Sequence, residues 1–219
     1  MTIEVQEEVL EKLAIIHADI NACRQCEPFV ENFLKPLSMS RGQPGSIIIV
    51  GQEPGKGEVA SQRAFSGRSG QRLDQWLVAS GFYAASPRSG IYTTSVAKCL
   101  CEKQKLRVLY GNCSRFLERQ LRAIQPTLII SLGAVAYQAV RFNKAEFKNT
   151  VCTLSRSDAE EAGFHTNLGF DYALMSWPHP SPGSRWHNST ENRGKLQESF
   201  DVLRDYVTSI GADLESKIV

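Results

Sequence analysis

The sequence predicts an α/β fold: a single domain with a central parallel four-stranded sheet and helices on both faces. Short β-branched or apolar runs of strand length alternate along the chain with segments of helical periodicity, an order typical of parallel sheets. The chain has 219 residues, of which 42% are hydrophobic. It can therefore bury the core of one such domain over residues 1–219.

The first half of the chain predicts two helices and two strands. Residues 3–20 carry apolar side chains at helical spacing, and the run IIIV at 47–50 reads as a buried strand. The loop over 51–69 is punctuated by glycine and proline and is too long to be a simple connector. A helix is predicted over 70–80 and a second strand over 91–96.

The second half continues the alternation. A helix is predicted over 106–124, a third strand over 128–132 and a helix over 133–140. The fourth strand covers 173–177, and an amphipathic helix over 189–207 follows. Because the carboxyl ends of parallel strands meet at one edge, where ligands bind, we expect the loops after the strands to form a site.

Composition and charge narrow the functional class only in part. The net charge of +2 and a pI of about 8.2 do not indicate a nucleic-acid partner, which needs a local basic patch. No apolar run approaches the roughly 20 residues that cross a membrane, so we expect no membrane partner. The N-terminus has an acidic amphipathic pattern rather than that of an export signal, which predicts a cytoplasmic protein. Residues 143–170 are polar and show no strong period.

Four cysteines form the pattern C-x2-C followed later by C-x13-C. They are Cys23, Cys26, Cys99 and Cys113. In a reducing compartment such a set more often binds metal than forms disulfides, and four thiolates suit either tetrahedral zinc or an iron–sulfur cluster. Cys101 is an alternative to Cys99 as the third ligand, and the four cysteines could also be unconnected buried side chains. We expect residues 1–30, with the first two cysteines, to pack on the domain.

The long loop after the first predicted strand carries polar and aromatic groups among glycines. In VGQEPGKGE, residues 50–58, the glycines allow a tight turn, and Gln52 and Glu53 stand just beyond a buried strand. The motif lacks the end of a phosphate-binding P-loop, and a solvated connection is the alternative. Phe65 follows in the glycine-rich RAFSGRSG, where its ring could stack on a nucleobase or simply anchor the loop.

The loop WPHPSPGSRWHN, residues 177–188, comes directly after the fourth strand. Its prolines stiffen the loop that presents His179, which favours a site residue over a rigid surface turn. Further side chains of the loop are donors fit for phosphate oxygens: Ser181, Ser184, Arg185 and His187. We expect Trp186 to be exposed and able to wedge into a base stack.

These motifs, in this order and spacing, resemble the uracil-DNA glycosylase superfamily, most closely its iron–sulfur branch. The resemblance covers about residues 20–205. It rests on GQEPG at 51–55, FSGRSG at 65–70, SVAKC at 95–99, Cys113 at the start of a helix and the HP loop at 179.

The resemblance implies an enzyme of base excision repair. Such an enzyme flips a deaminated base, most often uracil, out of DNA and hydrolyses its N-glycosidic bond as a monofunctional glycosylase. It implies damaged DNA as the partner, a monomer, and a bacterial cytoplasmic location at the nucleoid. It also favours a [4Fe–4S] cluster over zinc, bound by Cys23, Cys26, Cys99 and Cys113.

The resemblance also implies roles for individual residues. Glu53, or Gln52 in its place, would position water, and His179 would stabilise charge on the base carbonyl. The base would contact Gly51, Phe65 and Ser95. The DNA contacts would be Gly67, Ser69, Gly70, Ser181, Ser184, Arg185 and Trp186.

One departure from the family bears on the substrate. The family has Asn where this chain has Ser95, and a serine hydroxyl cannot span two base atoms as an amide does. Hypoxanthine or xanthine is therefore an alternative substrate. Two further alternatives are a DNA-lesion-binding protein with little catalysis and a zinc-stabilised hydrolase of another substrate.

Overall fold

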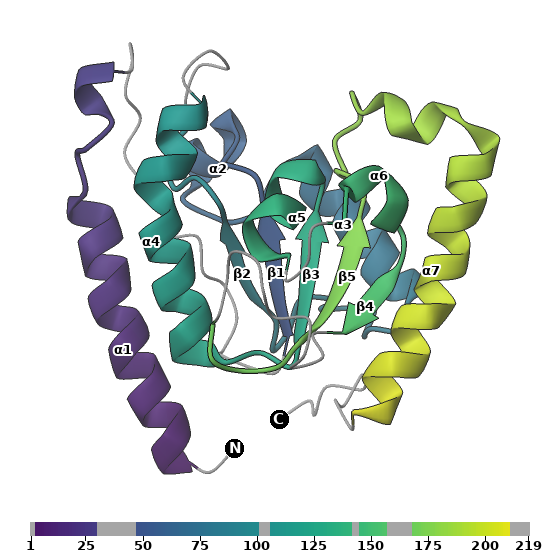
Figure 1. Ribbon diagram of the computed structural model, residues 1–219, viewed down its shortest axis with the longest axis horizontal. Helices are drawn as coiled ribbons and strands as arrows, with labels where there is room; N and C mark the ends of the chain where they lie inside the picture. The colour runs from purple at the N-terminus through teal and green to yellow at the C-terminus, as the bar shows by residue number, and fades with distance from the viewer. Residues whose placement is uncertain (1–2, 30–46, 101–105, 142–144, 157–167, 211–219) are drawn as a thin grey trace.

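The computed structural model describes residues 3–29, 47–100, 106–141, 145–156 and 168–210. A central sheet of five strands, in the order β2-β1-β3-β5-β4, lies between two layers of helices (Figure 1). Four strands are parallel: β1 (Ile47–Gly51), β2 (Tyr92–Ser95), β3 (Leu128–Leu132) and β5 (Ala173–Trp177). The predicted α/β class is confirmed. Among the described helices, none has the length and apolar character to cross a membrane.

The four parallel strands are buried along their whole length, as their β-branched and apolar sequences predict. Alternate residues of a strand enter opposite cores. In β1, Ile48 and Val50 belong to one hydrophobic cluster and Ile47 and Ile49 to the other. Both faces of the sheet are therefore covered, as parallel sheets require.

The number of strands was predicted wrongly. A fifth strand, β4 (Leu154–Arg156), pairs antiparallel with β5 at the edge of the sheet. Its three residues are half-buried or exposed, so no apolar run marks it in the sequence. It is defined by its register, in which Leu154 lies opposite Met175, rather than by an intrinsic strand signal.

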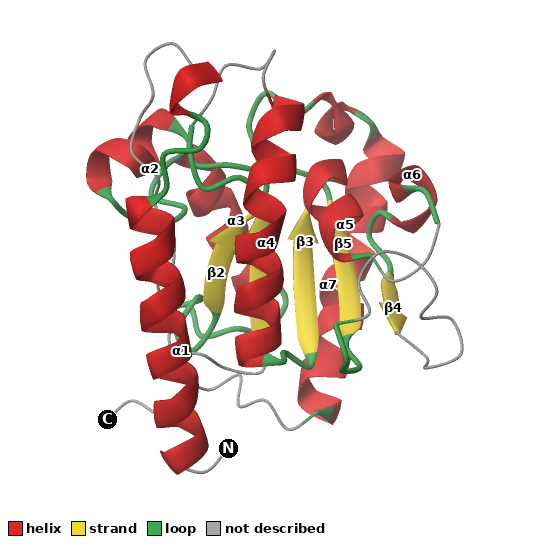
Figure 2. Cartoon of the chain, turned by 60° about the vertical axis from the view of Figure 1, so that its left-hand side comes forward, coloured by secondary structure: helices red, strands yellow, loops and turns green. Residues whose placement is uncertain are grey.

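The helices divide between the two cores. Apolar residues of α1 (Ile3–Ala22), α4 (Leu106–Ile124) and α5 (Ala134–Val140) fill the first core. Residues of α3 (Arg68–Ala79) and α7 (Thr190–Ser209) fill the second. The two remaining helices are short: α2 (Lys56–Ser61) and α6 (Phe147–Thr150). Figure 2 shows α1 and α4 side by side in front of the sheet.

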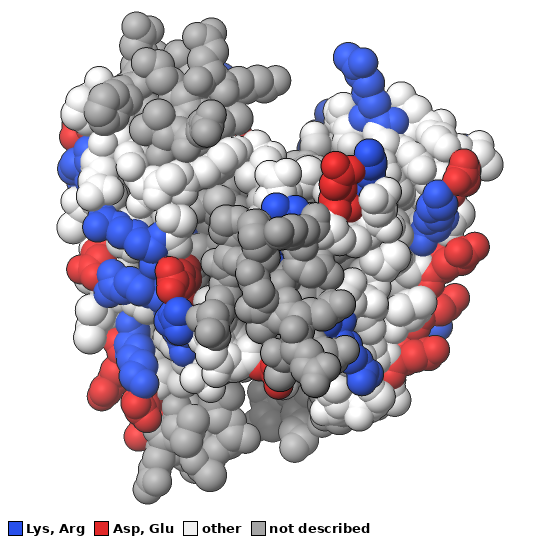
Figure 3. All heavy atoms as spheres, in the orientation of Figure 1, with Lys and Arg blue, Asp and Glu red and all other residues white. Residues whose placement is uncertain are grey.

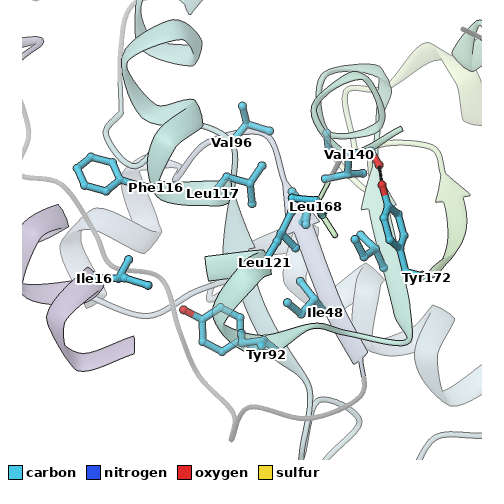
Figure 4. Close-up of a cluster of buried hydrophobic side chains, with 14 of the residues drawn as sticks. Ile16, Ile48, Tyr92, Val96, Phe116, Leu117, Leu121, Val140, Leu168 and Tyr172 are labelled. Carbon is cyan, nitrogen blue, oxygen red and sulfur yellow. Dashed lines mark hydrogen bonds between the residues drawn. The ribbon is translucent and has the colours of Figure 1, made fainter. Parts of the chain in front are cut away.

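The first core binds the N-terminal helix to the sheet. Figure 4 shows Ile16 of α1, Phe116 and Leu121 of α4 and Tyr92 of β2 around one apolar region. An ion pair at 2.7 Å between Arg119 and Asp19 joins the two helices at the surface. The helix that precedes the first two cysteines is thus packed against the helix that carries Cys113.

Candidate active site

A cavity of about 550 Å³ lies at the carboxyl ends of β1 and β5. The loops that follow the two strands form most of its wall. Its lining residues are Gly51, Gln52, Glu53, Pro54, Gly55, Glu58, Phe65, Ser69, Leu100, His179, Ser181, Gly183 and Ser184. Residues far apart in the sequence, predicted as catalytic or base-binding, therefore meet in one cavity, as the parallel topology requires.

The loop after β1 is held against the exit of β2 by its backbone. The N–H groups of Val96 and Ala97 donate to the carbonyls of Gly51 and Gln52, at 3.0 and 2.9 Å. The half-buried Gln52 amide lies 3.4 Å from Glu53 Oε1, to which its Nε2 donates. A carboxylate and an amide fixed side by side in a cavity can orient a water molecule for attack.

Phe65 has a strained backbone that its surroundings maintain. Its φ is +49°, in the left-handed region that non-glycine residues rarely adopt. Its ring lies over Gly51, where an added Cβ would be 3.1 Å from Phe65 Cζ. Gly70 is buried beneath the Phe65 carbonyl, so close that an added Cβ would be 1.8 Å from the oxygen. The ring of Phe65 therefore explains the glycine at 51, and its backbone carbonyl explains the glycine at 70.

Arg88, to which the sequence assigned no function, also supports the Phe65 loop. Arg88 donates from Nε and Nη2 to both carboxylate oxygens of Asp74, at 2.7 and 3.1 Å. Its Nη1 also donates to the carbonyl of Ala64 at 3.1 Å. The guanidinium thus connects α3 to the residue before Phe65, a contact 24 residues distant in sequence that no local pattern predicts.

His179 has a defined proton arrangement. Its Nδ1 accepts the N–H of Ser181 at 3.1 Å, so the neutral ring carries its proton on Nε2. Burial and, second, the charge of His187 hold the pKa of His179 below its usual value. Behind it, Gly133 has a φ of +86°, and an added Cβ there would be 3.1 Å from His179 Cβ. The ring is a neutral hydrogen-bond donor in the cavity wall.

The loop after His179 is fixed at several points. Arg72 of α3 donates to the carbonyl of Ser181 at 3.3 Å, and His187 Nε2 donates to the carbonyl of His179 at 3.1 Å. Burial also lowers the pKa of His187. Trp186 is half-buried rather than exposed as predicted, because its ring packs on the second core and lies 5.4 Å from the His187 ring. Arg185 is exposed.

The other predicted DNA contacts occupy different environments. Ser69, Ser181 and Ser184 line the cavity. The N–H of Gly67 instead donates to Glu58 Oε1 at 3.0 Å. Glu58 was noted in the sequence as part of VGQEPGKGE but was assigned no function. Its position three residues after Gly55 is the spacing of a capping box, and that signal could have identified it.

Ser95 does not line the cavity. Its side chain is completely buried, and Oγ donates to the carbonyl of Ala97 at 2.6 Å. The hydroxyl therefore stabilises the turn after β2 instead of facing a bound base.

The predicted cysteine ligands lie in one corner, beside α4. Cys26 and Cys99 belong to one buried cluster, and Cys113 is buried next to it. Two N–H groups approach sulfur: Asn112 Nδ2 lies 3.4 Å from Cys26 Sγ, and the Lys98 amide lies 3.4 Å from Cys113 Sγ. The described cysteines form no disulfide, and within the described ranges no three potential ligands converge on a metal position. Cys101 lies outside the described residues.

Lys98 places a buried amino group beside the cysteine corner. It is fully buried, and its Nζ donates to neutral oxygens of Thr94 and Gln120, each at 2.8 Å, and to the carbonyl of Ser95. Burial lowers its pKa to about 7, and the charge of Cys113 opposes that shift. A centre with four thiolates would be anionic and would compensate the ammonium, so the donor set and its surroundings fit such a centre.

The surface seen in Figure 3 is not a uniform basic patch. Lys and Arg are interspersed with Asp and Glu along both sides of the molecule. Among the described residues, several Lys and Arg side chains form ion pairs with carboxylates, such as Arg122 with Glu118 at 2.9 Å and Lys195 with Glu191 at 2.7 Å. The described residues on the face seen in Figure 3 form no concentrated positive patch for a polyanion.

Comparison with known proteins identifies related sequences. The family model of the uracil DNA glycosylase superfamily matches residues 41–204. A type-4 uracil-DNA glycosylase from Archaeoglobus fulgidus is 30% identical over 151 residues, which are 67% of this chain and 71% of that protein. A type-4 uracil-DNA glycosylase from Saccharolobus solfataricus is 22% identical over 206 residues, 91% of this chain and 88% of that protein.

Among solved structures, the wild-type UNG crystal structure from Nitratifractor salsuginis is similar to this chain with a TM-score of 0.42 and 15% identity. The similarity covers 93% of this chain and 98% of that one.

Proposed function

The chain belongs to the uracil DNA glycosylase superfamily, as its motifs predict, and we propose that it is a monofunctional glycosylase that hydrolyses the bond between uracil and deoxyribose in DNA. One observation carries the proposal: Glu53, Phe65 and His179, which come from different segments, line the same cavity.

The first step is extrusion of the base from the duplex. Unstacking and unpairing cost about a few kcal/mol, least at a mismatch such as one with uracil, which favours damaged sites. The Phe65 ring, held over Gly51, would offer a stacking surface to the extruded base. The hydroxyl groups of Ser69, Ser181 and Ser184 would donate to the neighbouring phosphates, and the exposed Arg185 would add a positive charge.

Cleavage of the bond leaves negative charge on the departing base. His179 can stabilise it, because its neutral ring retains a proton on Nε2 while Nδ1 is occupied by the Ser181 amide. A donor fixed before reaction does not have to reorient as charge develops. The proton stays on His179, whose function is electrostatic stabilisation rather than acid catalysis.

The sugar becomes cationic as the bond breaks, and water must reach its anomeric carbon. The Glu53 carboxylate would stabilise that cation and orient the water, and the Gln52 amide restrains the carboxylate through the contact at 3.4 Å. The oriented water attacks the anomeric carbon and its proton passes to the Glu53 carboxylate, which leaves an abasic site, while the departing base anion takes up a proton from solvent.

Cys23, Cys26, Cys99 and Cys113 would hold a [4Fe–4S] cluster, with zinc as the alternative. The buried Lys98 ammonium and the two N–H groups next to Cys26 and Cys113 support an anionic thiolate centre in this corner. Such a centre would act as a structural link between the end of α1, the loop after β2 and α4. The catalytic groups themselves belong to other parts of the chain.

Because Ser95 does not face the cavity, its side chain does not select uracil over other deaminated bases. Because Oγ is engaged with the Ala97 carbonyl, it offers the base edge neither a donor nor a long amide. Hypoxanthine and xanthine are therefore included beside uracil in the test. A DNA-binding function with little catalysis would be indicated by tight binding without cleavage of any of these.

The test is single-turnover cleavage of short DNAs that contain one uracil, hypoxanthine or xanthine, with alkali to reveal abasic sites. We expect Glu53→Gln and His179→Ala to lower the rate by about 10²–10³-fold. Glu191→Gln, an exposed change on α7, is the matched control and should retain the wild-type rate. Unchanged cleavage by both active-site variants would refute the assigned mechanism.

The functional unit is proposed to be a monomer that acts in the bacterial cytoplasm at the nucleoid. Light scattering at the protein concentration of the cleavage assay would measure the mass of the active species.

A further inference from the structure

We propose that Glu58 is a positioning residue whose carboxylate clamps two loops of the cavity together, the loop of Glu53 and the loop of Phe65. The inference rests on the proposed function in one respect, because it takes Glu53 and Phe65 to act on the same substrate. It adds a residue to which the sequence analysis assigned no function.

The carboxylate makes one hydrogen bond to each loop. Oε2 accepts the N–H of Gly55 at 3.1 Å, and Oε1 accepts the N–H of Gly67 at 3.0 Å. Hydrogen bonds from amides to a carboxylate are stronger than those between neutral groups. Glu58 itself is half-buried in the cavity wall. A single rigid group therefore sets the separation of the two loops.

The identities of the two partner residues support the clamp independently. Neither needs to be glycine for its backbone conformation, since φ is −87° at Gly55 and −95° at Gly67. A side chain at Gly55 would displace the carboxylate, because an added Cβ would be 2.6 Å from Oε2, and one at Gly67 would crowd it, at 3.1 Å from Oε1. Glycine at these positions is explained by the approach of the Glu58 carboxylate.

The two anchor points lie close to the proposed catalytic groups. Gly55 follows Glu53 by two residues, with the buried Pro54 between them, and Gly67 follows Phe65 by two residues. Gly55 is also the residue before α2, and Gly67 the residue before α3. A shift of either anchor would move Glu53 relative to the stacking ring. Displacements of about 1 Å in a catalytic site can lower a rate by about 100-fold.

The test compares Glu58→Gln with Glu58→Ala in the full-length protein with its metal content intact. Glutamine can accept from one loop only and turns a donor toward the other N–H, whereas alanine loses both contacts. We expect kcat on uracil DNA to fall by about 10-fold in Glu58→Gln and by about 100-fold in Glu58→Ala, while KM changes by less than about threefold. A purely structural residue would instead lower the amount of folded protein at an unchanged rate per folded molecule.

A double-mutant cycle tests the contact itself. Gly55→Ala is compatible with the backbone at φ −87° but forces the carboxylate away, so it should reproduce the defect of Glu58→Gln. The double variant that combines Gly55→Ala with Glu58→Ala should be no slower than Glu58→Ala alone, because Glu58→Ala already removes the hydrogen bond that Gly55→Ala breaks. Additive losses would overturn the clamp.

Hydrogen exchange separates this inference from the proposed function. We expect the amide protons of Gly55 and Gly67, followed by NMR, to exchange at least about 10-fold faster in Glu58→Ala than in the wild type, whether or not the protein cleaves DNA. Glu53→Gln is the control and should leave both exchange rates unchanged. Unchanged exchange in Glu58→Ala would refute the clamp even if cleavage were lost. Should that variant fail to fold, Glu58→Gln gives the same measurement for one anchor.

Discussion

The cavity at the strand ends and the cysteine corner differ in what holds them in place. In the cavity, His179 is fixed by Ser181, and Glu58 is fixed by two backbone amides. In the corner, sulfur atoms have single N–H neighbours at 3.4 Å, and no described set of side chains converges on a metal position. The protein chain alone therefore arranges the first region, whereas the second has its ligands nearby but not in coordination geometry.

This difference indicates where stability and chemistry reside. Preorganised hydrogen bonds serve catalysis because they need no rearrangement during the reaction. Metal ligands can be arranged by the metal itself, which couples binding to folding. Lys98 lies beside the corner, since its amide approaches Cys113 Sγ, and its Nζ donates to the Ser95 carbonyl at the end of β2. Three predictions examine the contrast, from the largest expected effect to the smallest.

The largest effect is expected from removing a cysteine ligand. Cys113→Ser should abolish binding of the proposed metal centre and lower the free energy of unfolding by about several kcal/mol, because the Lys98 ammonium loses its compensating charge. Iron and zinc content, measured together with thermal unfolding, will check this. Cys152→Ser is the matched control, since Cys152 packs on the second core instead and should leave the metal content unchanged.

If Cys113→Ser retained full metal content, the ligand set would be wrong. If the variant lost the metal but kept its unfolding temperature, the cysteine corner would be held in place by the protein chain alone, as the cavity is. The proposed difference between the two regions would then be wrong.

A change inside the cavity should affect chemistry without affecting the corner. Phe65→Ala removes the stacking surface, which is worth roughly 1–3 kcal/mol per base, or about 5–150-fold in the cleavage rate. Alanine, like phenylalanine, has a Cβ, so the substitution does not relieve the backbone strain at a φ of +49°. Single-turnover rates and metal content are measured on the same preparation. Loss of metal in this variant would show that the two regions are not independent.

The smallest effect is expected from pH. Burial lowers the pKa of His179 from its ordinary value of 6.5, so the ring is neutral at pH 7. As the pH falls below about 6.5, the unfolded state takes up protons before the folded state does, and stability decreases. Cleavage should fall only at still lower pH, where protonation of Nδ1 breaks the bond from Ser181. The rate of cleavage and the free energy of unfolding, each measured between about pH 5 and 8, would check both expectations.

His187→Gln sharpens this last prediction. The charge of His187 contributes to the lowered pKa of His179, so its removal should shift the acid limb of the rate toward higher pH. If the pH at which the cleavage rate falls were unchanged in His187→Gln, the low pKa of His179 would be due to burial alone.

The sequence by itself determined the parallel strands and the composition of the site. Runs such as IIIV at 47–50 are buried on both faces, so their apolar character is visible without tertiary information. The order of motifs along the chain also sufficed to predict the family, which is confirmed. Because parallel strands end at one edge, the meeting of Gln52, Phe65 and His179 in one cavity followed from topology alone.

Other properties were decided only by the tertiary structure. The strand at 154–156 exists because β5 offers it a partner, and Trp186 is half-buried because the second core lies beneath its loop. The Ser95 hydroxyl turns to a carbonyl rather than to the cavity, and the Glu58 carboxylate reaches an amide nine residues away. Each of these properties depends on which groups lie close together in the folded chain. Hydrogen bonds and ring packing between residues distant in sequence produce no repeating pattern of residue types, so the sequence alone did not predict them.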